Sequence, residues 1–596
     1  MTDQTNNTAL GSRRDFLGLA MGAVAAGTSS TVLGPTTAAA QAQPGGGSLP
    51  RKRSSRRPNI VFIFSDQERF ASTWPKGLSL PAHERLMRTG TTFLNHYCPA
   101  VMCTSSRAVL LTGLQTADNR MFENCDVPWV GNLSTKIPTV GHMLRKAGYY
   151  TAYKGKWHLN RKFDTQETDR LFTKEMDDYG FSDYFSPGDI IGHTLGGYQF
   201  DPLIASSAIT WLRRNGRPLT DDDKPWALFV SLVNPHDIMY FNTDRPGEKV
   251  QDTGTLIKHA ARAPEHEMFK ATWDVSVPKS YKEPFDAPGR PKAHGEFLQI
   301  WDYVLGHIPP EEERWRRFHD YYVNCTRSVD GQVDRILQEL DALGLTDNTV
   351  ICFTSDHGEA AGAHGLHGKG PFAYEETVHL PFFMVHPDVR GGQDCRALTG
   401  HIDVVPTLLS IAGVSPEKIA GIAGRQLPGK DFSSVLTNPS SADIHAVRDA
   451  ILFTYSGLGA NDATLWKTVA EARAAGKNSA MAILKQGFKP DMQKRGSLRS
   501  TYDGRYKFTR YFAPAERNRP TNLTDLYKHN DVELFDLQND PEEMNNLAID
   551  KDANASLIST MNDKLERVIK AEIGVDDGRE MPNIPLIEWN IDRPDL

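Results

Sequence analysis

Four stretches of the chain are rich in apolar, β-branched and aromatic residues and then end in polar residues. The first is PNIVFIFSD at 58–66, and the others cover 148–159, 226–237 and 349–359. A strand that is apolar on both faces leaves no side for solvent, which is typical of the middle of a parallel sheet. The pattern therefore predicts four central strands.

Helical patterns lie between and after these strands. Residues 137–148 and 333–344 carry apolar side chains at helical spacing and end in glycine, and residues 402–413 repeat the pattern. The alternation predicts an α/β fold in which a large, mostly parallel central sheet is flanked by helices. Because ligands bind beyond the carboxyl ends of the strands in such sheets, we expect the four polar strand ends to meet in one site.

The pattern changes after about residue 440. Residues 497–512 predict a hairpin and residues 555–573 an amphipathic helix. We therefore expect a catalytic α/β domain at 58–440 and a smaller C-terminal α+β domain at 441–596. Residues 240–315 are rich in Pro, Lys, Glu and aromatics with weak periodicity, and predict a long excursion over the active face. That excursion would either shape substrate access or serve as a structural cover.

The N-terminus has the features of an export signal. Residues 12–20, SRRDFLGLA, place paired arginines before Phe-Leu, and small residues suited to cleavage follow at 38–43. This resembles a twin-arginine signal over 1–43, followed by a basic Gly/Ser/Arg linker at 44–57. A transmembrane anchor is the alternative, but Gly, Ser and Thr interrupt the apolar stretch. We expect export by the twin-arginine translocase to the periplasm or the medium, with no stable membrane anchor.

Composition narrows the class of protein. With 39% hydrophobic and 24% charged residues, the chain has the composition of a soluble globular protein, and at 596 residues it is too long for one ordinary core. Its net charge of −7 gives no electrostatic reason to expect a nucleic-acid partner. Six cysteines are too few for a disulfide scaffold, although a bridge between Cys98 and Cys125 stays open.

A cysteine stands where a helix is expected to begin. In VMCTSSRAVLLTG at 101–113, Cys103 precedes three residues that favour helix caps, and Arg107 follows one turn later. The free N–H groups and the positive end of the helix dipole lower the pKa of a thiol and attract an anion. From these residues alone, a functional and a structural Cys103 both remain open.

Two acids end two of the predicted strands, and each is followed by a further ligand. Asp66 precedes Gln67, and Asp356 precedes His357. Carboxylate and amide oxygens suit a hard cation such as Ca²⁺, whereas the histidine shifts the preference toward Mn²⁺. A single such acid is usually a cap or a turn former, but two pairs at two strand ends predict a split metal site.

Basic residues gather at the other strand ends and in a Gly-rich loop. This surplus of cations beside a metal indicates a dianionic transferable group, either a sulfate or a phosphate ester. A zinc site built from the H-x-x-H of the loop is a weaker alternative. The residues are Lys156, His158, His236, His364, His367 and Lys369.

Taken in order, the motifs resemble the sulfatase family, part of the alkaline phosphatase superfamily. The resemblance implies a sulfuric ester hydrolase of the arylsulfatase type, which releases an alcohol and inorganic sulfate from a small-molecule or carbohydrate ester. It also implies that a formylglycine-generating maturation enzyme oxidises Cys103 and that the aldehyde hydrate is the nucleophile. The motifs are PNIVFIFSDQ, CTSSRAVLLTG, GYYTAYKGKWHL, NPHD, FTSDHGE, IDVVPTLLSIAG and LFDLQNDPEEMNNLA.

The resemblance also implies a role for each residue. Arg107 and Lys156 would hold the formylglycine. His158 would be the base on its second hydroxyl, and His236 and Lys369 would bind the sulfate and assist the leaving oxygen. One divalent cation is expected, Ca²⁺ first with Mn²⁺ or Mg²⁺ as alternatives. Its ligands would be Asp66, Gln67, Asp356, His357 and the modified Cys103.

The sequence departs from the family pattern at three positions. Ser105 replaces the usual signature proline, Gln67 stands where many members have a second aspartate, and His357 stands where many have asparagine. The last two resemble the branch that contains choline-sulfatases and phosphonate monoester hydrolases. Two alternatives therefore stay open: a phosphonate monoester or phosphodiester hydrolase on the same scaffold, and an unmodified, non-catalytic oxyanion-binding homologue.

Overall fold

The computed structural model covers most of the chain. The predicted export signal at 1–43 and most of the linker at 44–57 lie outside the described residues. Contacts divide the chain into Met1–Lys52 and Arg53–Leu596, and every described residue belongs to the second unit. The described residues are 56–581 apart from 128, 165–170, 187, 190–192, 252–259, 477–490 and 517–518.

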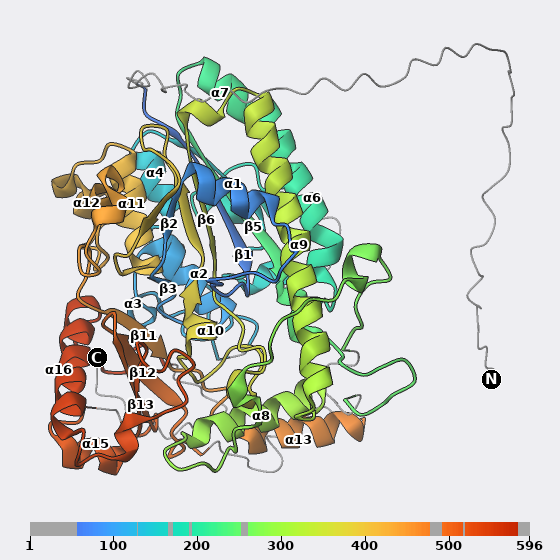
Figure 1. Cartoon of the computed structure of the whole chain (residues 1–596). Helices are drawn as coiled ribbons and strands as arrows, with labels where there is room; N and C mark the ends of the chain where they lie inside the picture. The colour runs from blue at the N-terminus through green and yellow to red at the C-terminus, as the bar shows by residue number, and fades with distance from the viewer. Residues whose placement is uncertain are drawn as a thin grey trace, which may run out of the picture. The chain divides into compact units, whose positions relative to one another are not determined.

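A seven-stranded sheet in the order β4-β5-β1-β6-β8-β2-β9 forms the centre of the molecule (Figure 1). The four predicted strands are neighbours in it and run parallel, while β8 is antiparallel to both of its neighbours. The predicted α/β class is therefore confirmed. The strands are β1 (Asn59–Asp66), β2 (Thr91–Phe93), β4 (Tyr150–Gly155), β5 (Trp226–Pro235), β6 (Thr349–Ser355), β8 (Phe382–Val385) and β9 (Gln393–Cys395).

Helices bury both faces of this sheet, which explains why β1 is apolar at consecutive positions. Val61 and Ile63 pack with α1 (Pro81–Thr89), α6 (Gly196–Trp211) and α9 (Glu312–Ala342). The alternate residues pack with α2 (Cys103–Thr112), α4 (Val140–Lys146) and α11 (Val404–Ile411). Figure 1 shows α6 and α9 on one side of the sheet and α4 and α11 on the other. Each fully buried aliphatic or aromatic side chain stabilises the fold by about 1.5–3 kcal/mol.

The excursion at 240–315 contains a helix that was not predicted from the sequence. Helix α8 (Lys292–Leu305) buries Phe297, Ile300 and Trp301 at helical spacing, so the periodicity is present but confined to four turns between proline-rich flanks. The helix predicted at 333–344 is only the last part of α9, which is 31 residues long. Its first half carries aromatic residues under the excursion, which hid the helical pattern.

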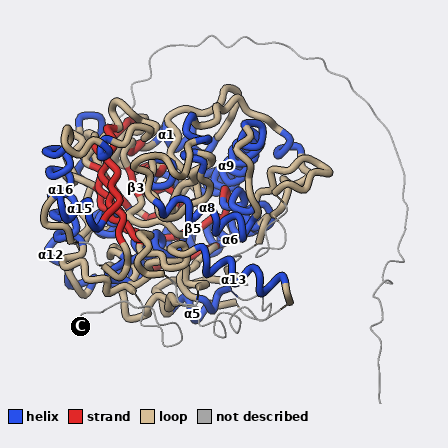
Figure 2. Tube along the Cα trace, turned by 90° about the horizontal axis from the view of Figure 1, so that it is seen from below, coloured by secondary structure: helices blue, strands red, loops and turns tan. Residues whose placement is uncertain are grey.

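A four-stranded antiparallel sheet forms the C-terminal part of the chain, and Figure 2 shows the helices beside it at one end of the molecule. The predicted hairpin is confirmed, with Gly504 at its turn in the left-handed region at φ +94°, where a side chain would be strained. The elements are β11 (Ile451–Tyr455), β12 (Ser497–Tyr502), β13 (Tyr506–Phe512), β14 (Asn530–Asp536), α15 (Leu523–His529) and α16 (Ala555–Glu572).

The catalytic and C-terminal regions share a hydrophobic core. One cluster joins Tyr97 and Trp301 to Phe453 and Leu498 of the C-terminal sheet. The buried ammonium of Lys507 on β13 also lies 2.6 Å from the Glu375 carboxylate and 3.0 Å from that of Glu543. The predicted division at 440/441 remains a prediction.

Smaller elements complete the described chain. In the part that the structure describes, no helix is both long and apolar enough to span a membrane. A three-stranded sheet consists of β3 (His96–Tyr97), β7 (His379–Leu380) and β10 (Thr399–Gly400). The remaining helices are α3 (Thr116–Asn119), α5 (Thr173–Asp177), α7 (Arg217–Asp221), α10 (Glu375–Val378), α12 (Pro416–Ala423) and α13 (Ala463–Ala474).

Short turns of 3₁₀ or π helix join these elements. They are η1 (Arg161–Asp164), η2 (Leu212–Gly216), η3 (His236–Tyr240), η4 (Glu267–Lys270), η5 (Lys279–Lys282), η6 (Thr346–Asn348), η7 (Ala363–Gly365), η8 (His401–Asp403), η9 (Ser433–Thr437), η10 (Pro439–Ser441) and η11 (Leu547–Ile549).

Candidate active site

The carboxyl ends of the four parallel strands meet at one edge of the central sheet. Asp66 is the last residue of β1, and Asp356 follows β6 directly. Ser65 pairs with Ser355 across these two strands, so the two acids lie side by side. The residues that follow β4 and β5 reach the same edge, because those strands are the next ones in the sheet. The predicted convergence of the strand ends is confirmed.

Helix α2 presents Cys103 to this edge as its first residue. The residue before the helix is Met102, at φ +85° and without a side-chain cap, so the expectation that Thr104, Ser105 or Ser106 caps the helix is wrong. The Thr104 hydroxyl instead donates to the His158 carbonyl at 2.8 Å, and the Ser106 hydroxyl donates to the Asp356 carbonyl. These hydroxyls tether the helix start to two strand ends.

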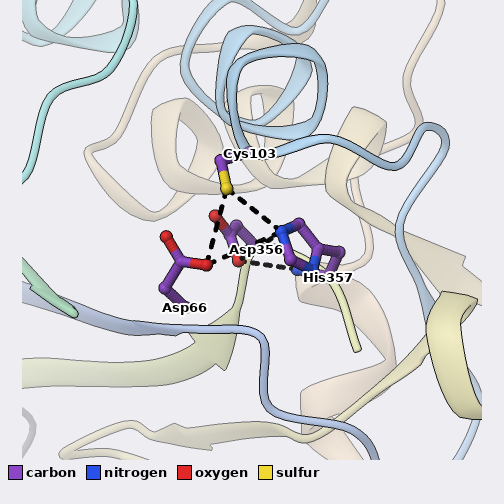
Figure 3. A group of neighbouring side chains, drawn as sticks. All are labelled: Asp66, Cys103, Asp356 and His357. Atoms are coloured by element: carbon purple, nitrogen blue, oxygen red, sulfur yellow. Dashed lines mark hydrogen bonds and ion pairs between the residues drawn. The ribbon is translucent and has the colours of Figure 1, made fainter. Parts of the chain in front are cut away.

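Four side chains with metal-ligating atoms surround one point (Figure 3). One ligand atom from each of Asp66, Cys103, Asp356 and His357 lies within 4.8 Å of the others, and all four residues are buried. The Cys103 sulfur is 3.3 Å from His357 Nε2 and 3.6 Å from Asp66 Oδ1. His357 Nε2 is 3.6 Å from Oδ1 of each aspartate. The cluster thus turns one oxygen of each carboxylate toward a shared centre.

The other oxygen of each carboxylate is bound by cationic side chains. Arg107 donates from Nη2 to Asp66 Oδ2 and from Nε to Asp356 Oδ2, both at 2.9 Å. Lys156 Nζ donates to Asp66 Oδ2 at 2.6 Å and lies 3.8 Å from the Cys103 sulfur. Burial would raise the pKa of the Asp66 carboxyl, but Lys156, His236 and Arg107 outweigh it and hold that pKa well below its usual range. Asp66 is therefore ionised in this buried site.

Gln67 extends the cluster on the side of the Gly-rich loop. Its side-chain oxygen accepts a hydrogen bond from Lys369 Nζ at 2.7 Å, and its side-chain nitrogen donates to Glu359 at 2.5 Å. Its backbone sits at φ +74°, where the Tyr322 hydroxyl donates to its carbonyl and its own N–H donates to Asp356. This turn lets two successive residues, Asp66 and Gln67, face the same site.

Two histidines complete the edge. His158 has φ +55°, and its backbone N–H donates to the Asp189 carboxylate at 2.7 Å. Burial lowers the pKa of His158, but Asp126, whose oxygen is 3.6 Å from Nε2, and Cys103 outweigh it, so that pKa is raised. His236 follows β5, and burial together with Lys156 lowers its pKa well below the usual value.

All ten residues predicted for the site come together at this edge, whereas two loop histidines do not. His364 pairs with Glu283 at 2.6 Å and stacks on Tyr374, and His367 packs among aromatic rings that include Trp301. Among the described residues, the metal-capable cluster contains neither, so the zinc alternative gains no support. All six cysteines are buried and none forms a disulfide in the part of the chain that the structure describes, so the Cys98–Cys125 bridge does not form.

Three carboxylates that support the site were not predicted from the sequence. They are Asp126 beside His158, Asp189 beneath the His158 backbone, and Glu359 beside Gln67. Only Glu359 left a signal, because it ends the FTSDHGE motif. The other two come from loops whose local sequence has no recognisable spacing to the site.

Comparison with protein-family models and known proteins gives consistent matches. The sulfatase family model matches residues 58–414. The choline-sulfatase of Rhizobium meliloti is 27% identical over 386 residues, covering 61% of this chain and 69% of that protein. The N-acetylglucosamine-6-O-sulfatase of Bacteroides thetaiotaomicron is 26% identical over 410 residues, covering 62% of this chain and 71% of that protein.

Solved structures share the fold. A 2-O GAG sulfatase superposes with a TM-score of 0.61 at 19% identity and covers 88% of this chain and 94% of its own. The phosphonate monoester hydrolase of Agrobacterium radiobacter superposes with a TM-score of 0.57 at 19% identity, covering 87% of this chain and 96% of its own. The mixed sheet with flanking helices and the smaller C-terminal sheet are common to this fold.

Proposed function

The chain belongs to the sulfatase family of the alkaline phosphatase superfamily and is a hydrolase of sulfate esters, and from this premise we propose that Cys103, converted to formylglycine, is its nucleophile. The observation that carries the proposal is the position of the Cys103 sulfur, 3.3–3.6 Å from His357 and Asp66 at the start of a helix. A nucleophile at this position lies beside cationic side chains and free helix N–H groups, which favour an anionic ester.

The residues around Cys103 fit a divalent cation. Two carboxylates each turn one oxygen to the same centre while Arg107 binds the other, and Gln67 and His357 add an amide oxygen and a ring nitrogen. We propose Asp66, Gln67, Asp356 and His357, with the modified Cys103, as its ligands. The oxygen-rich donor set favours Ca²⁺, with Mn²⁺ or Mg²⁺ as alternatives. When bound, the cation would neutralise the transferring group, and the aldehyde hydrate would supply the attacking hydroxyl.

The other side chains would bind the ester and move protons. Arg107 and Lys156 orient the modified side chain, because Arg107 fixes both carboxylates and Lys156 lies against the sulfur. His158 would take a proton from the second hydroxyl, which returns the aldehyde and releases sulfate. His236, kept neutral by burial, would donate a hydrogen bond to the ester, and Lys369 would stabilise the leaving oxygen.

Export and substrate class belong to the same proposal. The paired arginines and small residues within 1–43 support twin-arginine export to the periplasm or medium, after a maturation enzyme has acted on Cys103. A sulfated carbohydrate is the substrate class that the neighbours support, since one enzyme that shares this fold binds D-glucosamine-2-N,6-O-disulfate as its substrate.

Mass spectrometry and sulfate release test the proposal together. In protein purified from its own host, the peptide spanning 89–107 should carry formylglycine at Cys103. The protein should release sulfate from members of a panel of aryl and sugar sulfates, and Cys103→Ala should abolish that release. An unmodified cysteine in a protein that still turns over sulfate esters would contradict the proposed nucleophile.

One observation favours a second activity on the same scaffold. The Gln67 side-chain oxygen accepts from Lys369, and His357 Nε2 lies 3.3 Å from the Cys103 sulfur. These are the two departures that resemble the phosphonate monoester hydrolase branch. We therefore propose phosphonate monoester or phosphodiester hydrolysis as the alternative. Turnover of matched aryl sulfate and aryl phosphonate esters separates the two activities, and a large preference for phosphonate would reverse their order.

A further inference from the structure

We infer that Glu359 is a positioning residue that determines which end of the Gln67 amide faces the centre of the site and holds the loop that delivers Lys369. The inference rests on the proposed metal role of Gln67. Glu359 is fully buried behind Gln67, on the far side of that amide from Lys369. Its two oxygens serve two different purposes.

One oxygen selects the orientation of the amide. Glu359 Oε2 accepts a hydrogen bond from Gln67 Nε2 at 2.5 Å. Glu359 accepts hydrogen bonds at both carboxylate oxygens, so the amide turns its N–H group toward Glu359 and its oxygen the other way. That oxygen accepts from Lys369 Nζ at 2.7 Å. The oxygen and nitrogen ends of an amide have nearly the same shape, so its orientation depends on its partners: Glu359 fixes it from the nitrogen end, and Lys369, which only donates, fixes it from the oxygen end.

The other oxygen closes the loop that precedes Lys369. Glu359 Oε1 accepts from the backbone N–H of Gly368 at 2.6 Å and from that of Ala361 at 2.9 Å. Ala360 N–H also donates to the Gly368 carbonyl at 3.0 Å. Both ends of the loop, at Ala361 and Gly368, are therefore bound to Glu359. Lys369 follows Gly368 directly, so this contact also fixes the position of the Lys369 backbone. The Glu359 carboxylate thus binds both the Gln67 amide and the backbone of the loop that carries Lys369, and Lys369 in turn binds the same amide.

Replacing Glu359 by glutamine keeps the shape and forces a conflict. In Glu359→Gln, the side-chain oxygen can still accept from the loop, but its nitrogen then opposes the nitrogen of Gln67. Either the Gln67 amide flips and turns N–H groups toward Lys369 and the cation, or the loop loses its acceptor. Loss of a partner that orients a metal ligand typically lowers metal affinity about 10–100-fold, and we expect that loss for Glu359→Gln in a calcium titration.

A second substitution at position 67 distinguishes orientation from general structural support. In Gln67→Glu alone, two carboxylates face each other, so the metal-free protein should unfold at a lower temperature. In the Gln67→Glu/Glu359→Gln pair, the amide nitrogen introduced at position 359 donates to the carboxylate introduced at position 67, and every partner is restored. The metal-free Gln67→Glu/Glu359→Gln protein should therefore unfold at a higher temperature than the Glu359→Gln protein. An effect of the same sign in both backgrounds would overturn the inference.

The experiment compares full-length proteins purified with metal and then stripped by chelation. Glu533→Gln is the matched control, because that buried carboxylate accepts from the hydroxyls of Tyr374 and Tyr511 away from the site, and it should leave calcium affinity unchanged. Calcium affinity in Glu359→Gln equal to that of the wild type would also overturn the inference. A wild type that neither binds calcium nor releases sulfate would instead count against the proposed function, and the stability comparison in metal-free protein would still decide the role of Glu359.

Discussion

At the scale of single residues, Arg107 balances the charge of the site. Its side chain is fully buried and binds both carboxylates, the Lys156 carbonyl and the Ser231 hydroxyl. A lysine keeps the positive charge but offers one nitrogen in place of a planar fork. Removing either carboxylate contact leaves a buried charge without a partner, which costs far more than the loss of an exposed ion pair.

We predict that Arg107→Lys lowers the free energy of unfolding by about 2–3 kcal/mol, since each hydrogen bond to a charged group is worth about 1.5–3 kcal/mol. Denaturant unfolding measures the change. Arg85→Lys is the matched control, because Arg85 makes a similar forked contact to the half-exposed Asp341, and its cost should stay below about 1 kcal/mol. Equal losses at the two positions would contradict the assignment.

His83 predicts a pH dependence of stability. It lies buried between Glu68 at 2.8 Å and Asp330 at 2.6 Å. Burial alone would lower its pKa, but the two carboxylates raise it from 6.5 to about 10. The folded state therefore holds this proton more tightly than the unfolded state. Its contribution to stability is complete below pH 6.5 and is lost as pH rises through about 10.

We predict that His83→Asn lowers the free energy of unfolding by about 3–5 kcal/mol near pH 6.5, because it leaves two buried carboxylates without their cation. The difference from the wild type should shrink as pH rises through about 10, because the wild-type imidazole then becomes neutral as well. Unfolding curves for both proteins at several pH values measure it. A difference that stays constant across this range would show that His83 is not charged in the fold.

The reactive residues of the site were easier to predict from the sequence than the carboxylates that hold them in place. Asp66, Asp356 and His236 were predictable because buried parallel strands place their carboxyl ends together. Asp189 and Asp126 were not, because each acts through a contact to His158 from a loop about 30 residues away, and no local spacing encodes such a contact.

At the scale of elements, the first turn of α2 holds Cys103, the proposed nucleophile, at the strand ends. The N–H groups at the start of a helix have no partner within it, and the first backbone hydrogen bond of α2 runs from Ser106 N–H to the Met102 carbonyl. The Ser105 hydroxyl is buried and has no hydrogen-bond partner among the described atoms. A proline at position 105 would therefore remove no side-chain hydrogen bond.

We predict that Ser105→Pro leaves the thermal midpoint within a few degrees of the wild type, because proline in the first helical turn removes no helical hydrogen bond. In a host with an aerobic maturation enzyme, the variant should carry a larger fraction of formylglycine at Cys103, since it restores the family signature. Peptide mass spectrometry measures that fraction. Ser106→Ala serves as the contrasting variant, because its hydroxyl tethers α2 to Asp356 and its loss should lower stability.

Helices were predicted less completely than strands. The strands of the central sheet are buried on both sides, so their apolar runs stand out. Helix α8 was missed because its buried residues alternate with polar ones over only 14 residues, and α9 was recognised only where its apolar positions are aliphatic. In the first half of α9 the buried positions are mostly aromatic, and the helical period was not recognised there.

At the scale of the whole molecule, the C-terminal sheet completes the core beneath the catalytic region. The buried Lys507 of β13 lies between Glu375 of the catalytic region and Glu543, and the two regions share a hydrophobic cluster. Composition suggested two regions but gave no sign of this shared core, because the pairing joins residues more than 100 positions apart.

We predict that Lys507→Met lowers the free energy of unfolding by about 3–5 kcal/mol, because it leaves the buried Glu543 carboxylate without its cation and removes a partner of the half-buried Glu375. The loss should appear in one transition that fluorescence and activity report together, since the shared core makes the two regions unfold as one. Lys279→Met, which removes an exposed pair with Glu542, should cost less than about 1 kcal/mol. Two separate transitions in the wild type would contradict a shared core.

The burial of Cys103 determines when its proposed conversion to formylglycine could take place relative to folding. Its side chain is 1% exposed, behind the strand ends and the first turn of its own helix. An enzyme that oxidises this thiol must reach its sulfur, and the folded chain buries it. The proposed oxidation of Cys103 would therefore have to precede folding, while the segment is nascent. On this proposal, a molecule that folds first would keep its thiol, and the specific activity of a preparation would depend on the rate of oxidation relative to the rate of folding.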